Sequence, residues 1–384
     1  MSTTTPNTTG LKIAALAGDG IGPEIMQEAI KILRAIGKRF ALTLEITEGS
    51  LGWAAIDKEG EALPDSTVAL CKRSGAILVG AAGLYYRDPE VVKEKRPERA
   101  LLRLRKQLGL FANLRPVKLY PELADACPLR PERQGDGIDI LMVRESTGGL
   151  YYAYPRKTEP VMEIKEAGTA AQEVLRAVDT MALTATEIER IAHVAFRAAW
   201  LRRRKVTSVD KANILETSIL WRKIVTETSH EYPQVSLENM LVDTAAMQLM
   251  LRPAQFNVIL CESTFGEILS DEAAALVGSL GILPSASLGY SRDGQTCGLF
   301  EPAGGTAPDI AGKNVANPIA EILAAALMLR YSFGLEDAAK AIETAVGTVI
   351  SAGYRTADIF THGATGLRKV STSQMGDAIA DAIS

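Results

Sequence analysis

Apolar segments with the spacing of strands alternate with amphipathic segments along the first eighty residues. Residues 11–17 form an apolar run broken by one lysine, and the stretch 23–40 repeats its apolar positions at helical spacing. A second strand is predicted at 42–46, a helix at 65–73 and a third strand at 76–80. Strands that alternate with helices are typical of an α/β fold built on a largely parallel sheet.

The same alternation continues through the middle and the C-terminal part of the chain. Further strands are predicted at 138–144, 206–209, 237–243 and 258–261, and further helices at 186–205, 245–251, 318–333, 336–351 and from Thr372 onward. Residues 156–180 are polar, and the segment 170–177 within them has a helical pattern.

Composition and charge place the chain among ordinary globular proteins. Hydrophobic residues make up 47% and charged residues 23%, and the net charge of −4 argues against a nucleic-acid partner. The four cysteines are far apart and include no CxxC pair, which favours reduced thiols. The first residues lack the pattern of a signal peptide, and no apolar run is long enough to span a bilayer. We therefore predict a cytoplasmic protein without a membrane or nucleic-acid partner.

The first strand leads into a glycine-rich turn, Gly18-Asp-Gly-Ile-Gly-Pro-Glu24. Its GxG pattern is similar to a dinucleotide fingerprint, but Pro23 stands where the third glycine would be. Proline at that point suits the first turn of a helix. The turn therefore does not predict a Rossmann fold.

Two carboxylates stand one helical turn apart after the strand 258–261. Glu267 and Asp271 share one helix face, where like charges repel by about 0.2–0.5 kcal/mol. Carboxylates placed after the carboxyl end of a strand suggest a site for a hard divalent cation. The alternative is a solvated helix start, where the helix dipole favours acidic residues.

Cationic side chains also follow predicted element ends. Arg105, Arg115 and Arg144 would bind a dicarboxylate if they converge, because the guanidinium fork matches a carboxylate. Each is otherwise a solvated surface arginine. Lys211 follows the strand 206–209 and is a candidate base if its pKa is lowered, or else a surface partner of Asp210.

A long stretch of small residues, 301–317, precedes the helix 318–333. Free backbone N–H groups in such a segment can approach a pyrophosphate, and Asp309 could bind ribose hydroxyls and repel a 2′-phosphate. The alternative is a structural loop, although loops of this length are uncommon unless they are functional.

Ten segments in order resemble one family. They are GDGIGPE, RPERALLRLRK, LFANLRPVKLYPEL, VRESTGGLYY, TSVDKANIL, SILWRKIV, VDTAAMQLM, FGEILSDEAA, LPSAS and EPAGGTAPDIAGKNVANPIA. Together they are similar to the 3-isopropylmalate dehydrogenases of leucine biosynthesis, within the β-decarboxylating dehydrogenases. The resemblance runs from about residue 11 to residue 376. It implies NAD-dependent oxidation and decarboxylation of (2R,3S)-3-isopropylmalate.

The resemblance implies a role for each motif. Substrate would be bound by Glu98, Leu101, Leu102, Arg105, Arg115, Arg144 and Asp243, and protons would be moved by Tyr151 and Lys211. Mg²⁺ or Mn²⁺ would be held by Asp243, Glu267 and Asp271. NAD would be bound by Gly305, Thr306, Ala307, Pro308, Asp309, Ile310 and Asn317.

The implied fold is two-domain and α/β, with a large mixed sheet and no Rossmann domain. Residues 1–110 and 278–384 would form one discontinuous domain with most of the NAD site, and residues 111–277 an inserted domain with the dimer interface. The active site of the homodimer would be shared, with Lys211 and Asp243 supplied by the second subunit.

This chain departs from the family pattern at several positions. Glu267 replaces an aspartate, residues 81–86 replace a glycine-proline-lysine-tryptophan loop, and the segment 154–178 differs from the expected arm. Two alternatives to isopropylmalate oxidation follow. One is a paralogue that acts on another 2-hydroxy diacid such as D-malate, tartrate or homoisocitrate, and the other is a catalytically impaired family member.

Overall fold

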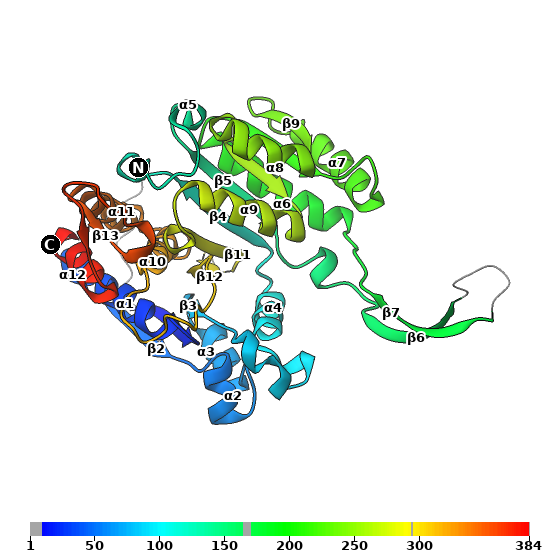
Figure 1. Cartoon of the computed structure of the whole chain (residues 1–384), viewed down its shortest axis with the longest axis horizontal. Helices are drawn as coiled ribbons and strands as arrows, with labels where there is room; N and C mark the ends of the chain where they lie inside the picture. Colours follow the sequence, from blue (N-terminus) through cyan, green and yellow to red (C-terminus); the bar gives the residue numbers. More distant parts are fainter. Residues whose placement is uncertain (1–9, 164–169, 293–294, 384) are drawn as a thin grey trace.

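A ten-stranded sheet runs through the whole molecule in the computed structural model, which describes residues 10–163, 170–292 and 295–383 (Figure 1). The strand order is β2-β1-β3-β12-β11-β4-β5-β10-β8-β9. These strands are β1 (Leu11–Gly18), β2 (Leu44–Glu48), β3 (Ala76–Ala81), β4 (Ala112–Lys118), β5 (Asp139–Glu145), β8 (Lys205–Asp210), β9 (Ser236–Leu241), β10 (Val258–Cys261), β11 (Pro284–Arg292) and β12 (Gln295–Pro302).

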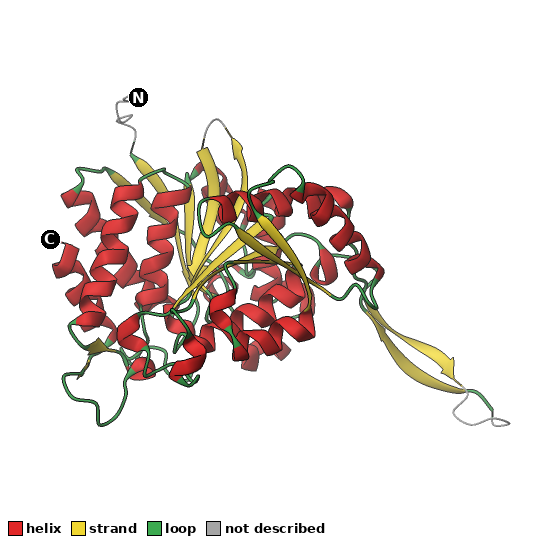
Figure 2. Cartoon of the chain, turned by 90° about the horizontal axis from the view of Figure 1, so that it is seen from above, coloured by secondary structure: helices red, strands yellow, loops and turns green. Residues whose placement is uncertain are grey.

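Helices cover both faces of this sheet (Figure 2). The described helices are α1 (Gly22–Arg39), α2 (Trp53–Glu59), α3 (Asp65–Arg73), α4 (Pro97–Leu108), α5 (Pro131–Gln134), α6 (Ala185–Trp200), α7 (Glu216–Ser229), α8 (Val242–Leu251), α9 (Ser263–Leu276), α10 (Ile319–Tyr331), α11 (Glu336–Ser351) and α12 (Thr372–Ile383). None of them has the length and apolar character needed to cross a membrane.

The period-two pattern of β1 separates two cores. Ile13 and Ala15 join the large core that includes α1, α10, α11 and α12, whereas Ala14 and Leu16 join a smaller core beneath α3 and α4. Side chains that alternate between the faces of a strand explain this division. Apolar runs such as β1 and β3 are therefore buried on both faces, as expected for internal strands of an α/β sheet.

The sheet is mixed, which confirms the predicted fold class. Most pairs are parallel, but β11 runs antiparallel to both β12 and β4, and β4 runs antiparallel to β5. A doubly wound Rossmann sheet has a different strand order and parallel central strands. The glycine-rich turn accordingly leads into α1, which has proline at its start, within a different topology.

The strand order is compatible with the predicted two domains. The five strands from β2 to β11 come from residues 1–110 and 278–384, and the five from β4 to β9 come from residues 111–277. The domain boundaries stay a prediction.

The helical prediction for residues 170–177 is wrong. They form most of β7 (Gln172–Val178), which pairs antiparallel with β6 (Lys157–Glu163) in a hairpin that projects from the body (Figures 1 and 2). Most of the side chains in β7 are exposed, so little packing distinguished its faces in the sequence. The segment is a strand because it pairs with β6 across the hairpin. The spacing of residues within β7 alone does not predict that pairing.

Candidate active site

The helix α9 begins at the end of β10, and its start is fixed by a buried glutamate. Both carboxylate oxygens of Glu262 accept backbone N–H bonds, from Thr264 at 2.8 Å and from Phe265 at 2.7 Å. Burial raises the pKa of Glu262. Glutamate is not among the preferred N-cap residues, so this role could not be predicted from the sequence. With the helix start fixed, Glu267 and Asp271 project from one face of α9.

Glu267 lies between a tyrosine and an arginine. The hydroxyl of Tyr151 donates to Glu267 Oε2 at 2.7 Å, and Arg144 Nη2 lies 3.6 Å from the same oxygen. Burial acts to raise the pKa of Glu267, but Arg144 and the Tyr151 bond hold it below its ordinary value. Burial and Glu267 raise the pKa of Tyr151 to about 12, so its hydroxyl stays protonated.

Arg144 reaches this position because α9 has a glycine opposite it. A Cβ atom on Gly266 would lie 2.8 Å from Arg144 Cγ and 2.9 Å from its Cδ. The absence of a side chain at Gly266 therefore leaves the space in which the buried arginine crosses the helix.

Arg115 and Arg144 meet because β4 and β5 are antiparallel neighbours. Arg115 pairs with Met142, so Arg144, two residues further on, is its diagonal neighbour on the same face. Arg115 Nη1 donates to Ser270 Oγ at 2.7 Å and to Asp271 Oδ1 at 3.0 Å. Burial and the nearby Arg144 lower the pKa of Arg115 to about 10. Burial also raises the pKa of Asp271, against the opposing effect of Arg115.

Arg105 joins the group from α4. It forms an ion pair with Glu301 at the end of β12, and both side chains are largely buried. Burial acts to lower the pKa of Arg105, but Glu301 and other nearby groups raise it. Glu301 was not predicted as a site residue, and it ties the start of the long loop 303–318 to the arginines.

The three arginines retain donors that no group in the described part of the chain accepts. Arg105 Nε, Arg115 Nε, and both Nε and Nη1 of Arg144 are buried and have no hydrogen-bond partner among the described residues. Buried N–H groups of this kind are rare in proteins unless a ligand or water satisfies them. The cluster therefore fits an anionic ligand with several oxygen atoms, such as a dicarboxylate.

Lys211 and Asp243 form a second, separate group. They follow the ends of the parallel strands β8 and β9, where Asp210 pairs with Leu241 in register. Lys211 Nζ lies 2.6 Å from Asp243 Oδ1, and this bond lowers the pKa of Asp243. No described contact joins either residue to the arginine cluster of the same chain. One chain thus holds the predicted catalytic residues and metal ligands in two groups.

The alternative prediction, an ion pair between Lys211 and Asp210, is wrong. Asp210 is buried, bonds both Nε and Nη2 of Arg222, and accepts the backbone N–H of Ala212 at 2.9 Å. It therefore holds the turn that presents Lys211 at the strand end.

The predicted substrate residues of α4 lie in different surroundings. Leu102 lines a cavity of about 430 Å³ together with Tyr151 and Tyr152. Leu101 packs instead against the smaller core. Glu98 is exposed and approaches Gly83, where a Cβ would lie 2.2 Å from its Oε1.

The predicted NAD residues form one loop between β12 and α10 that interlocks with the glycine-rich turn. The carbonyl of Thr306 accepts the backbone N–H of Ile21 at 2.8 Å, and a Cβ on Gly20 would lie 2.1 Å from that carbonyl oxygen. Gly305 and Asp309 are exposed, Thr306 is buried, and Ala307, Pro308 and Ile310 are half-buried. Ala307 has a left-handed φ of 38°.

Asn317 and Asp19 hold the backbone around this loop. Asn317 Oδ1 accepts the N–H of Ile319 at the start of α10, and its amide donates to Asp358. Asp19, which sequence reasoning missed, accepts backbone N–H groups from Trp53, Ala54 and Gly83 at 2.8–3.0 Å. Its place in the turn between β1 and α1 was the only available signal.

The predicted metal ligands have the right donor type for Mg²⁺ or Mn²⁺, since all three are carboxylates. Glu267 and Asp271 share a face of α9, whereas Asp243 is held by Lys211. Among the described residues of one chain, no three His, Cys, Asp or Glu side chains are grouped to hold a metal ion. The donor set fits such an ion if the third carboxylate comes from elsewhere.

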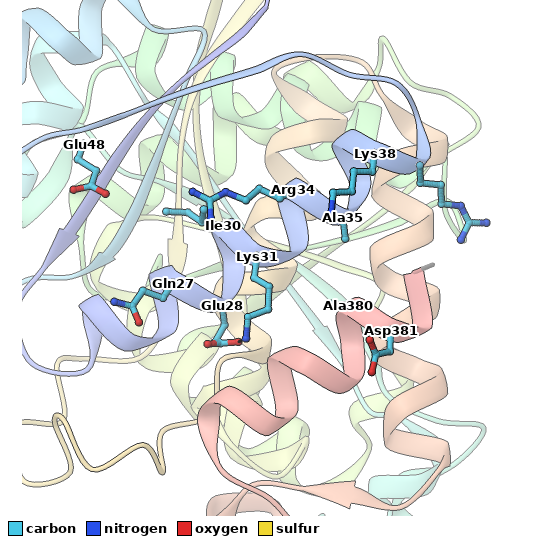
Figure 3. A pocket seen from close by; sticks show the side chains of 11 residues that line it. Gln27, Glu28, Ile30, Lys31, Arg34, Ala35, Lys38, Glu48, Ala380 and Asp381 are labelled. Carbon is cyan, nitrogen blue, oxygen red and sulfur yellow. Dashed lines mark hydrogen bonds and ion pairs between the residues drawn. The ribbon is translucent and has the colours of Figure 1, made fainter.

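A larger groove, of about 940 Å³, lies along α1 and α12 and contains none of the predicted site residues (Figure 3). Its central lysine, Lys31, is already paired with Glu28 at 2.5 Å and with Asp377 at 2.6 Å. The arginine cluster is therefore the better candidate for an active site.

The chain is similar in sequence to curated enzymes over almost its whole length. The chain is 53% identical over 369 residues to 3-isopropylmalate dehydrogenase from Syntrophotalea carbinolica, covering 96% of this chain and 97% of the relative. It is 50% identical over 372 residues to the enzyme of that name from Escherichia coli (strain UTI89 / UPEC), covering 96% of each.

Solved structures show the same fold. Isocitrate dehydrogenase from Methylococcus capsulatus superposes with a TM-score of 0.78 at 33% identity, covering 97% of this chain and 99% of the other. A β-decarboxylating dehydrogenase from Thermococcus kodakarensis superposes with a TM-score of 0.73 at 32% identity, covering 97% and 95%. The sequence profile of the isocitrate/isopropylmalate dehydrogenases matches residues 12–379, and the chain belongs to this family.

Proposed function

We propose that this protein is an NAD-dependent 3-isopropylmalate dehydrogenase of leucine biosynthesis. It oxidises (2R,3S)-3-isopropylmalate and releases CO₂ to give 4-methyl-2-oxopentanoate. The supporting observation is the group of buried arginine N–H atoms around Tyr151 and Glu267, which have no hydrogen-bond partner in the described part of the chain. That group occurs in a chain about half identical to proteins of this name.

The arginines bind and orient the substrate. Arg105, Arg115 and Arg144 offer their free N–H groups to the two carboxylates of the malate, and their burial strengthens each charge-assisted bond. Leu102, beside Tyr151 in the cavity, contacts the isopropyl group. Burial of apolar groups stabilises the complex by about 0.8 kcal/mol for each CH₂.

Two side chains move protons. Lys211 of the partner subunit takes the proton of the C2 hydroxyl as the alcohol is oxidised. Tyr151 gives its proton to C3 after CO₂ has left, and its raised pKa of about 12 keeps that proton in place beforehand.

The bound groups supply the remaining chemistry. When bound, NAD would supply the hydride acceptor and Mg²⁺ or Mn²⁺ would supply Lewis-acid stabilisation of negative charge on the substrate. Glu267 and Asp271, with Asp243 of the partner subunit, would hold the cation. The loop from Gly305 to Asn317 holds the adenosine half of NAD, and the exposed carboxylate of Asp309 disfavours the 2′-phosphate of NADP.

A homodimer with shared active sites accounts for the two separate groups of site residues. The turn after β8 and the helices α7, α8 and α9 expose apolar side chains that a partner would cover, namely Ile214 (69% exposed), Ile219, Met247, Met250, Leu251 and Ile268 (62% exposed). Exposed apolar side chains concentrated on neighbouring helices are typical of an interface between subunits.

The protein acts in the cytoplasm.

One observation favours a paralogue with another substrate. The cavity beside Leu102 is also lined by Arg99, Arg103 and Lys106. These cations would suit a C3 substituent that ends in a carboxylate, as in homoisocitrate, better than an isopropyl group.

A substrate panel tests the proposal. The ratio kcat/KM is measured with 3-isopropylmalate, D-malate, tartrate and homoisocitrate, with NAD and saturating Mg²⁺ or Mn²⁺. The highest value is expected with 3-isopropylmalate. A higher value with homoisocitrate would establish the paralogue, and no NADH formation with any of the four would indicate an impaired family member.

A further inference from the structure

The hydroxyl of Tyr152 is a buried polar group that the roles above leave unused. Its oxygen is shielded from solvent and has no hydrogen-bond partner among the described residues. The neighbouring Tyr151 differs, because its hydroxyl is engaged by Glu267. A buried hydroxyl without a partner is unfavourable in the free protein, so its presence requires an explanation.

Tyr152 lines a cavity and lies near two residues of the arginine cluster, Arg105 and Arg144. Lys106 Nζ lies 5.7 Å from the ring centroid, and both residues line the cavity that contains Leu102. Burial raises the pKa of Tyr152 to about 12, while the nearby Arg105 and Arg144 oppose this rise. The phenol therefore stays protonated close to two guanidinium groups.

The Tyr152 hydroxyl and the unused arginine N–H groups all need a hydrogen-bond acceptor. Arg105 Nε and the Nε and Nη1 of Arg144 are also buried, and no described residue accepts a hydrogen bond from them. Each of these groups needs an acceptor, and a neutral phenol beside two cations is positioned to donate to whatever anion they bind. A carboxylate offers two oxygens with several lone pairs and can satisfy more than one donor at once.

We propose that the Tyr152 hydroxyl donates a hydrogen bond to a substrate carboxylate bound by Arg105 and Arg144. This inference rests on the proposed function, since it takes the substrate to be a substituted malate. Tyr152 is thus a substrate-binding residue that adds a directional, uncharged donor to the arginines. This proposal takes the carboxylate to be the one on C1, which the product keeps after CO₂ has left from C3, so Tyr152 acts on binding and leaves the chemical steps unchanged.

The variant Tyr152→Phe tests this by removing one oxygen atom. Binding of 2-isopropylsuccinate, which has both carboxylates and no oxidisable hydroxyl, is measured by calorimetry without NAD, and KM and kcat are measured with 3-isopropylmalate. Loss of one hydrogen bond to a charged group predicts a rise of about tenfold in both Kd and KM, with kcat unchanged. The melting temperature of the unliganded variant should not fall, because no bond is lost in the free protein.

Tyr120→Phe is the matched control. Lys118 Nζ lies 5.7 Å from the Tyr120 ring centroid, as Lys106 does from Tyr152, and none of the site residues contacts Tyr120. This change should alter neither Kd nor KM.

Three results would overturn the inference. They are a Kd of Tyr152→Phe within twofold of the wild-type value, a clear fall in the melting temperature of the unliganded variant, and failure of the wild-type protein to bind the dicarboxylate. Failure of the proposed function gives a different result. In that case the wild-type protein binds 2-isopropylsuccinate, and the variant binds it more weakly, but 3-isopropylmalate is not oxidised.

Discussion

Two inactive variants should restore activity when their subunits exchange. Arg105→Ala removes a guanidinium from the arginine cluster, and Lys211→Ala removes the amine of the group at the ends of β8 and β9. No described contact joins these groups within one chain. If each active site takes its arginines from one subunit and its lysine from the other, a mixed dimer has one intact site and one doubly defective site.

The size of the recovery follows from the two-fold symmetry. Random exchange of equal amounts makes about half of the dimers mixed, and each mixed dimer has one working site of two. The activity should therefore reach about a quarter of the wild-type value per subunit. NADH formation is followed by absorbance before and after exchange, and mass spectrometry of differently labelled subunits confirms that exchange has occurred.

A second pair of variants is the control. Arg105→Ala mixed with Arg144→Ala places both lesions in the same group, so every site in the mixed dimer lacks one arginine and no activity should return. Activity that stays at the level of the parent variants after verified exchange of Arg105→Ala with Lys211→Ala would refute the shared site. Recovery in the control pair would show that the arginines themselves come from different subunits.

Three further predictions concern single residues. Tyr151→Phe should lower kcat by about 10²–10⁴-fold while substrate still binds, because it removes the proposed acid but no arginine, and a kcat within threefold of wild type would exclude that role. Asp309→Ala should shift the NADP-to-NAD ratio of kcat/KM toward NADP by roughly tenfold, since a like charge near the 2′-phosphate is removed, whereas an unchanged ratio would place Asp309 away from the ribose. Glu321 on α10 is fully buried, neither of its carboxylate oxygens has a partner among the described residues, and burial, with Glu301 nearby, raises its pKa well above the ordinary value. Since the unfolded chain releases this proton at lower pH than the folded protein does, stability is lost as the pH rises above about 4.5. The gain in melting temperature from Glu321→Gln should therefore be larger at about pH 8 than at about pH 5, and equal gains at the two pH values would contradict the buried neutral acid.

The sequence alone determined the fold class and most of the elements. Apolar runs such as 11–17 and 76–80 are buried on both faces whatever their neighbours are, so their length and composition predict internal strands. The site residues could be predicted only from the order and spacing of whole motifs. A single arginine is equally well explained as a solvated surface residue, and a lone carboxylate pair as a solvated helix start.

Only the tertiary structure decided which side chains meet. Arg115 and Arg144 are neighbours because β4 and β5 pair antiparallel in one register, and Lys211 pairs with Asp243 because β8 and β9 end together. The local pattern around Lys211 suggested Asp210, which Arg222 holds instead. The exposed hairpin β6–β7 was mispredicted for the same reason. Periodicity reports how a segment is buried, whereas partners far apart in the sequence are fixed by strand register and by the packing of helix starts.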